Sequence, residues 1–161
     1  MPPGWRPLIT TPHDVIFRQA ALKDADTVAE VAQTSRLHFL PYLPELHTVE
    51  EVKAYYRAVV FAECHVWVAE DAQGIVGFCA FQDGWVEHLY LLPTHVGKTL
   101  GRRLLDKAKA HQQTLRLWVF HQNIRAIRFY EQNGFRKIKE TDGSANEEHC
   151  PDALLEWRRP P

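Results

Sequence analysis

A strand–helix–strand pattern between residues 85 and 120 constrains the fold of this chain more than any other feature. Residues 85–92 are rich in β-forming side chains and are followed by Pro93. Residues 99–111 carry leucines along one helical stripe, and 115–120 again suit a strand. Two strands of one sheet that are joined by a crossover helix run parallel to each other. This segment therefore predicts a parallel strand pair.

The residues upstream of this crossover have the pattern of an antiparallel meander. Apolar and polar side chains alternate over 65–70, a glycine-containing turn follows, and β-forming residues continue over 75–82. Asp83-Gly84 provides a second tight turn into the strand at 85–92. Short β-forming runs separated by such turns are typical of consecutive antiparallel strands. Three antiparallel strands are therefore expected before the parallel one.

The remaining segments complete one mixed sheet. A T-x-x-E capping box at Thr48 and Glu51 opens a helix, which apolar spacing continues to Val60. The other expected elements are a strand at 15–20, a helix at 24–36, a Pro-containing loop at 38–47, a helix at 123–133, and strands at 135–140 and 153–157.

The order of these elements, β-α-α-β-β-β-α-β-α-β-β, predicts an α/β (α+β) fold with a mixed, mostly antiparallel sheet. We expect a single domain over 15–161 because no linker interrupts it, and a Pro-rich lead-in over 1–14.

Charge is balanced overall but uneven along the chain. The formal net charge of −1 argues against a dedicated nucleic-acid partner. Residues 97–139 nevertheless contain eleven Lys or Arg and two acids, whereas 140–157 contain six acids and no Lys or Arg. Solvated basic helix faces would explain the first stretch, and so would an anionic ligand. The sequence leaves both explanations open.

Composition and motifs exclude several other classes. No apolar run approaches the ~20 residues of a membrane span and no signal-peptide pattern is visible, so we expect a cytoplasmic protein without a membrane partner. Cys64, Cys79 and Cys150 lie far apart and form no CxxC pair, which indicates reduced thiols. The histidines form neither HExxH nor a Cys/His ligand spacing, so no metal site is expected.

The loop between the crossover strand and its helix is a candidate anion site. Gly97 and Gly101 flank the start of the helix, where unpaired backbone N–H groups and the positive end of the helix dipole meet. A plain turn that needs glycine is the alternative. A nucleotide P-loop, G-x-x-x-x-G-K-[ST], is disfavoured, because Leu92 occupies the position of its first glycine.

Residues 96–101 and 115–137 together resemble the GNAT acetyltransferases. In the family's loop, Q/R-x-x-G-x-G/A, Gly101 matches the last glycine, whereas Val96 and Thr99 replace the Gln/Arg and the middle glycine. The stretch LRLWVFHQNIRAIRFYEQNGFRK is similar to the family's strand-plus-helix signature. Its matching positions are Asn123, Ala126, Phe129, Tyr130 and Asn133-Gly134-Phe135. The similarity extends over nearly the whole chain from about Val15.

The resemblance implies a GNAT fold with about six or seven strands and about four helices. It also implies direct transfer of the acetyl group of acetyl-CoA to a primary amine of a small molecule or peptide, through a ternary complex and without a metal. Tyr130 would act as general acid toward the departing sulfur, because a phenol of pKa ~10 stays protonated at pH 7. Glu87 would accept the proton of the amine, directly or through water. A homodimer is a further implication.

A set of residues is assigned to the cofactor by the same resemblance. Strand residues would offer backbone groups to the pantetheine arm, and the loop with its basic neighbours would hold the phosphates. Asn123 would bond to the arm, cap its helix, or both. The set is Leu89, Tyr90, Leu91, Leu92, Val96, Gly97, Lys98, Thr99, Leu100, Gly101, Arg102, Arg103, Asn123 and Tyr130.

The departures at Val96 and Thr99 favour one alternative. A β-branched residue is unfavourable at positive φ and would crowd a phosphate that approaches the loop. The alternative is therefore an acyl-CoA-binding module with little or no turnover.

Overall fold

The computed structural model describes residues 14–161. The expected lead-in at 1–14 lies outside the described residues, apart from Asp14. The helices and strands, with their bounds, are β1 (Ile16–Gln19), η1 (Leu22–Asp24), α1 (Ala25–Phe39), α2 (Val49–Tyr55), η2 (Tyr56–Val60), α3 (Phe61–Glu63), β2 (His65–Asp71), β3 (Gly74–Gln82), β4 (Trp85–Leu91), η3 (Pro93–His95), α4 (Leu100–Lys109), β5 (Thr114–Phe120), α5 (Ile124–Gln132), β6 (Arg136–Thr141) and β7 (Asp152–Arg158).

The seven strands found in residues 14–161 belong to one sheet in the order β1-β2-β3-β4-β5-β7-β6. The predicted meander is confirmed, since β2, β3 and β4 pair antiparallel. The predicted crossover is confirmed as well, because β4 and β5 are parallel neighbours. The mixed α/β fold class is thus the one expected from the order of the elements.

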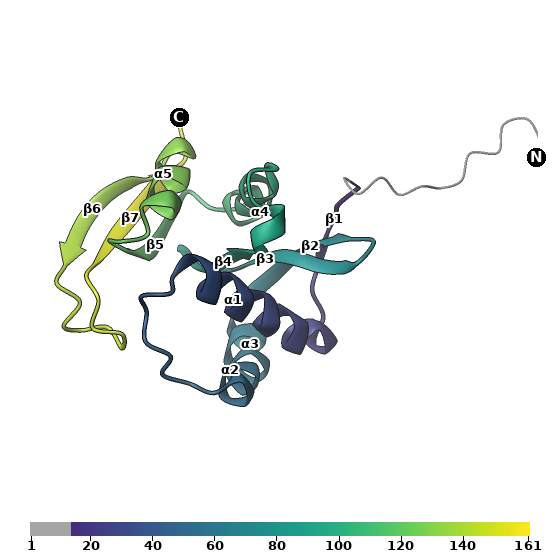
Figure 1. Ribbon diagram of the computed structural model, residues 1–161. Coiled ribbons are helices and arrows are strands. Elements are labelled where there is room, and N and C mark those ends of the chain that lie inside the picture. Colours follow the sequence, from purple (N-terminus) through teal and green to yellow (C-terminus); the bar gives the residue numbers. More distant parts are fainter. Residues whose placement is uncertain (1–13) are drawn as a thin grey trace, which may run out of the picture.

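Helices cover the sheet on both faces (Figure 1). On one face α4 and α5 enclose a core that includes Leu104, Leu105 and Leu117. On the other face α1 and the helical segment at 49–63 pack on Phe78 and Val68. Burial on both faces explains why β3 is almost continuously apolar rather than alternating.

Two helices differ from their expected extent. The capping box at Thr48 and Glu51 forms as predicted, but α2, the π-helical turn η2 and α3 then run on without a break to Glu63. Helix α1 includes His38 and Phe39, where a loop was expected. It ends two residues before Pro41, whose ring disfavours helical geometry only in the residue just before it.

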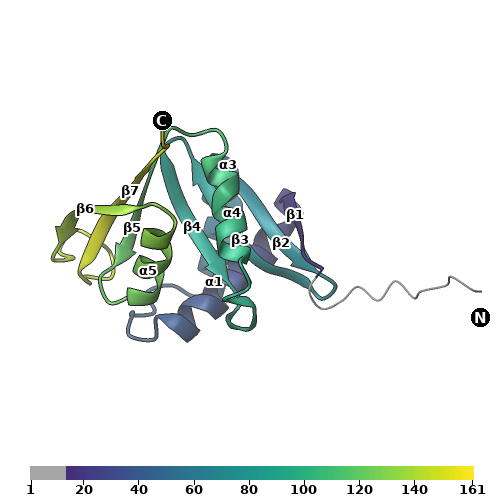
Figure 2. The same cartoon turned by 90° about the horizontal axis from the view of Figure 1, so that it is seen from above.

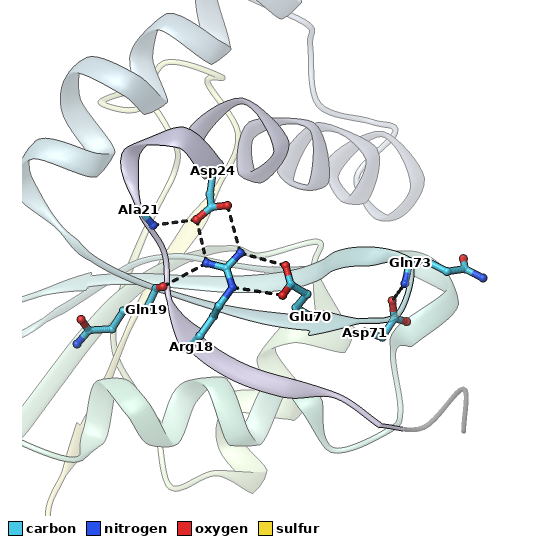
Figure 3. A network of polar contacts seen from close by, with 7 residues as sticks. All are labelled: Arg18, Gln19, Ala21, Asp24, Glu70, Asp71 and Gln73. Carbon is cyan, nitrogen blue, oxygen red and sulfur yellow. Dashed lines mark hydrogen bonds and ion pairs between the residues drawn. The ribbon is translucent and has the colours of Figure 1, made fainter. Parts of the chain in front are cut away.

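A polar network fixes the outer edge of the sheet (Figure 3). The guanidinium of Arg18 on β1 donates to Asp24 at 2.9 Å and to Glu70 on β2 at 3.0 Å. The backbone N–H of Ala21 also donates to Asp24, at 2.8 Å. The Arg18 guanidinium holds the pKa of the Asp24 carboxyl below its ordinary value. This network ties β1, η1 and β2 together at the edge farthest from β5.

Candidate functional site

The β4–β5 pair is where the sheet opens. Its parallel ladder has a single register pair, Trp85 with Arg116, and the N–H of Arg116 donates to the Gly84 carbonyl at 2.8 Å. Beyond that point the two strands separate, as Figure 2 shows. The backbone groups of β4 that face β5 are therefore not used in a ladder along most of the strand.

A cavity of about 790 Å³ occupies this opening. Its walls are formed by the end of α1, the second half of β4, the loop that leads into α4, the first turn of α4, and α5 with its cap. The lining residues shared with the sequence-based set are Leu89, Tyr90, Leu91, Val96, Gly97, Thr99, Gly101, Arg102, Asn123 and Tyr130. The other predicted residues, Glu87, Leu92, Lys98, Leu100 and Arg103, are not part of the wall.

The loop at 96–99 turns the chain sharply before α4 begins. Gly97 has φ 76° and Thr99 has φ 65°, so Thr99 adopts a left-handed conformation that glycine takes more readily. The first N–H groups of α4, which follows directly, have no partners within the helix. The start of α4 thus leaves backbone N–H groups without helical partners, and Thr99 carries the strain of a β-branched residue at positive φ.

Neighbouring cations in α4 have different surroundings. Arg102 lines the cavity. Arg103 instead lies over the ring of Phe17 on β1, with its guanidinium carbon 4.2 Å from the ring centroid. Leu100 is buried in the core. Of the three basic residues near this loop, Arg102 is therefore the one that the cavity wall includes.

Tyr130 brings a protonated hydroxyl to the cavity. Its ring is packed edge-to-face against Phe129 and Phe135, and 8% of the residue is exposed. Within the described part of the chain, the hydroxyl has no hydrogen-bond partner, yet no side-chain polar atom is both buried and unsatisfied. The hydroxyl therefore reaches solvent in the cavity. Burial raises the pKa of Tyr130 well above its ordinary value, so the phenol stays protonated at neutral pH.

Asn123 and the helix that it caps form the opposite wall. Its side-chain oxygen accepts from the N–H of Ala126 at 3.3 Å, which is the expected capping bond. The residue also lines the cavity. Capping and ligand contact are thus compatible at this position.

Glu87 lies at a β-bulge in β4. The register passes from Ala80–His88 to Phe81–Val86, so Glu87 is not opposite any residue of the β3 ladder. Its carboxylate accepts from the side chain of Gln82 at 2.9 Å and is exposed. Simple alternation along the strand does not hold here, because the bulge re-aims the side chain.

His88, next to that bulge, is turned toward the α1 face. Its ring lies 5.4 Å from that of Tyr56 and 6.3 Å from that of Tyr90, measured between centroids. Burial lowers the pKa of His88 to about 4, so the imidazole is neutral at pH 7.

Two loops meet beside the α1 wall of the cavity. Arg36 in α1 donates to the Pro44 carbonyl at 3.3 Å and pairs with Glu148 of the β6–β7 loop at 3.4 Å. His47 and Glu147 form a second link between the same loops. Other acids of the C-terminal stretch are engaged elsewhere, since Glu156 is buried between two arginines of the strands.

Sequence reasoning missed two parts of the wall. The first is one face of α5, where Arg125, Arg128, Phe129 and Gln132 follow helical spacing. The basic count of 97–139 included both arginines and was the available signal. The second is the end of α1, with Ser35, Phe39 and Leu40. Arg125 lies over the Phe39 ring at 4.3 Å and joins these two parts.

The described residues contain no group of three or more His, Cys, Asp or Glu that could hold a metal ion. None of the helices found between residues 14 and 161 has the length and apolar character needed to cross a membrane.

Comparison with known proteins places this geometry in a family. A model described as an acetyltransferase (GNAT) domain matches residues 62–137. An uncharacterized N-acetyltransferase of Archaeoglobus fulgidus is 30% identical over 114 residues, which is 60% of this chain and 77% of that protein. The peptidyl-lysine N-acetyltransferase YiaC of Escherichia coli is 24% identical over 102 residues, 63% of this chain and 68% of the relative.

A solved structure shares the fold. The PaiA N-acetyltransferase of Thermoplasma acidophilum, solved in complex with coenzyme A, superposes with a TM-score of 0.71 at 23% identity, over 91% of this chain and 99% of that one. The relatives and the shared fold lead to the same family assignment. The open parallel pair and the strand–loop–helix beside it are consistent with that assignment. The chain belongs to the GNAT superfamily of N-acetyltransferases, which are acyltransferases.

Proposed function

We propose that residues 15–161 act as one unit that transfers the acetyl group of acetyl-CoA directly to a primary amine of a small molecule or peptide. The observation that carries this proposal is the cavity between β4 and β5. It brings together an unpaired strand edge, the N-terminus of α4 and the hydroxyl of Tyr130.

The cavity wall fits a long, phosphate-bearing thioester. The free N–H groups at the start of α4, with Arg102 beside them, would hold the pyrophosphate. Backbone groups of Leu89 to Leu91 would hold the amide-containing arm. Gly101 keeps this wall clear, because a Cβ there would lie 3.2 Å from the ring of Phe129. The PaiA relative in complex with coenzyme A supports this ligand class.

Tyr130 is proposed as the general acid. Acetyl-CoA supplies an activated acyl group whose transfer leaves a thiolate. The Tyr130 hydroxyl faces the cavity, has no competing partner among the described residues and remains protonated at neutral pH. It would donate a hydrogen bond or its proton to the sulfur as the carbon–sulfur bond breaks.

Glu87 is proposed to accept the proton of the amine. An alkylamine of pKa ~10 is mostly protonated at pH 7 and must lose a proton before it attacks. Glu87 lies at the exposed bulge of β4, outside the cavity wall. Its role would therefore run through a water molecule. The YiaC relative, named as a peptidyl-lysine N-acetyltransferase, supports a primary amine as the acceptor.

Direct transfer is preferred to a covalent route through cysteine. Cys79 is fully buried, and burial raises its pKa well above the ordinary value. The pKa of Cys64 is raised to about 11 by burial and by Glu87 and Glu63. Neither group supplies a thiolate at neutral pH.

Calorimetric titration with acetyl-CoA and, separately, with ATP tests the proposal. We expect heat from acetyl-CoA alone, followed by thiol release when amines are added. Absence of acetyl-CoA binding would refute the proposed function. Binding without thiol release from any amine would favour the second candidate, an acyl-CoA-binding module. The left-handed Thr99 and the apolar Val96 in the loop favour that candidate.

A further inference from the structure

Asp71 and His95 form a contact that the proposed chemistry does not use. Asp71 is the last residue of β2, and His95 is the last residue of η3, directly before the loop at 96–99. The carboxylate Oδ2 lies 2.9 Å from Nε2 of the imidazole. The two side chains are 11% and 18% exposed, so the pair is largely shielded from water. A turn at one end of the β2–β3 hairpin thus contacts the entrance of the loop.

Both partners are oriented by further hydrogen bonds. Asp71 Oδ1 accepts from the N–H of Gln73 at 2.9 Å, within the turn shown in Figure 3. His95 Nδ1 lies 2.8 Å from the hydroxyl of Thr94. These contacts hold the pKa of Asp71 below its ordinary value. Because a carboxylate only accepts hydrogen bonds, Nε2 carries the proton in this contact.

The loop that follows has little internal support. The loop hydrogen bonds found among residues 14–161 include none donated by the N–H groups of Gly97 and Thr99. Two of the four residues of the 96–99 loop have positive φ, and one of them is Thr99. A segment with free amides and backbone strain keeps one conformation only when its ends are fixed. Helix α4 fixes the end at residue 100, and His95 provides the other attachment.

We propose that the Asp71–His95 pair is a tether that positions the 96–99 loop for the pyrophosphate of acetyl-CoA. The two are positioning residues, because they act through the loop and do not line the cavity. This inference rests on the proposed function. The tether keeps the free amides aimed before the ligand arrives, which lowers the ordering cost of binding.

Asp71→Asn and His95→Ala test the tether through the dissociation constant of acetyl-CoA. Asp71→Asn preserves the oxygen that faces Gln73 and places a donor opposite Nε2. We expect each variant to raise the Kd about tenfold, and the double variant to raise it no further, because one contact is lost in all three. His95→Gln, whose amide can still donate to Asp71, is expected to recover most of the affinity. Asp83→Asn in the β3–β4 turn is the matched control and should leave the Kd unchanged.

A second readout separates positioning from a general structural effect. S-acetylpantetheine carries the same thioester but lacks the pyrophosphate. We expect the variants to raise KM for acetyl-CoA with unchanged kcat, and to leave kcat/KM for S-acetylpantetheine unchanged. Equal losses with both thioesters, or additive effects in the double variant, would overturn the tether. If wild type binds acetyl-CoA and the variants have the same Kd, the tether alone is overturned. If wild type binds no acetyl-CoA, the proposed function is overturned, and the tether with it.

Discussion

The two edges of β4 are built in opposite ways. Along β3 the register holds from Gly77–Leu91 to Gln82–Trp85, with one bulge at Glu87. Along β5 it consists of Trp85–Arg116 alone. One edge is therefore closed by a ladder and by packed side chains, and the other opens onto a cavity with the hydroxyl of Tyr130.

Within β4, the edge that pairs with β3 contributes mainly to stability, and the edge that faces the cavity contributes mainly to binding and catalysis. Changes on the closed edge disturb packing that the whole sheet shares. Changes on the open edge remove groups that have no partner among the described residues, so they alter binding or catalysis with little effect on unfolding. The variants below test that separation, beginning with the largest expected effect.

Tyr130→Phe removes one hydroxyl of α5 from the cavity that the open edge of β4 faces. We expect kcat to fall about 100-fold, the scale of a lost general acid, while the free energy of unfolding changes little because the hydroxyl has no partner among the described residues. Thiol release at saturating acetyl-CoA and chemical denaturation measure the two effects.

Tyr56→Phe is the control for this change. Tyr56 is equally buried, at 4% exposure, but packs on the other face of the sheet. Its loss of a hydroxyl should leave kcat unchanged. An unaltered rate in Tyr130→Phe would refute the general-acid role.

Gly77→Val tests the closed edge. A Cβ at residue 77 would overlap Leu91 Cδ2 and lie 3.1 Å from the Tyr90 carbonyl oxygen. We expect the free energy of unfolding to fall by about 2 kcal/mol, as in other overpacked sites. Urea denaturation followed by circular dichroism provides the measurement.

Leu91→Ala in the Gly77→Val background serves as the matching test. It removes the side chain that the valine meets and should return part of the lost stability. If Gly77→Val unfolds at the wild-type urea concentration, the closed edge is less tightly packed than its geometry indicates.

Asp24→Asn acts at the far edge of the sheet, away from the cavity. The variant loses the charge-assisted bonds from Arg18, and we expect a loss of about 1–2 kcal/mol at pH 7. The folded-state pKa of Asp24 lies below the unfolded value of ~3.9, so its contribution is present above that pH and disappears as the pH falls through the folded pKa.

Denaturation of Asp24→Asn and wild type at pH 7 and below pH ~4 follows this difference. The difference in unfolding free energy between wild type and Asp24→Asn should become smaller at the lower pH. At pH 7 the two proteins should have the same Kd for acetyl-CoA. The exposed Asp83→Asn should show no such difference at either pH. A pH-independent difference would assign the loss to packing instead of charge.

Thr99→Gly should have the smallest effect and the opposite sign. Removing a β-branched side chain at φ 65° should raise the free energy of unfolding by about 1 kcal/mol and tighten acetyl-CoA binding. His149→Gly, at φ 53° in the β6–β7 loop, is the control: it should gain stability without any change in Kd. A loss of stability in Thr99→Gly would show that the threonine is not strained.

Local sequence rules predicted most of the fold. The capping box at Thr48 and the Asn cap at residue 123 depend on neighbours within a few positions, and both form as expected. The crossover after Pro93 likewise required a parallel pair, which is present. Each of these features is determined by residues that are close together in the sequence, so a single sequence is enough to predict it.

Features that depend on tertiary contact could not be read in this way. Nothing near Phe39 indicates that α1 ends against α5, because the contact joins residues far apart in the chain. Arg102 and Arg103 are adjacent and chemically alike, and only the direction of the α4 axis sends one to the cavity and the other to Phe17. The bulge at Glu87 interrupts the alternation of faces along β4, and no residue type within 85–92 indicates it.

The single pair between β4 and β5 also has a consequence for biosynthesis. Strands β1 to β4 and the helix α4 that packs on them precede residue 110, whereas β5, β6 and β7 all follow it. The first group needs almost no backbone hydrogen bonds from the second. Because the ribosome synthesises the chain from its amino end, β1 to β4 and α4 can begin to fold before β5, α5, β6 and β7 have been translated. The order of synthesis therefore predicts that the cavity, and the core that both groups share, is completed when the second group of strands docks.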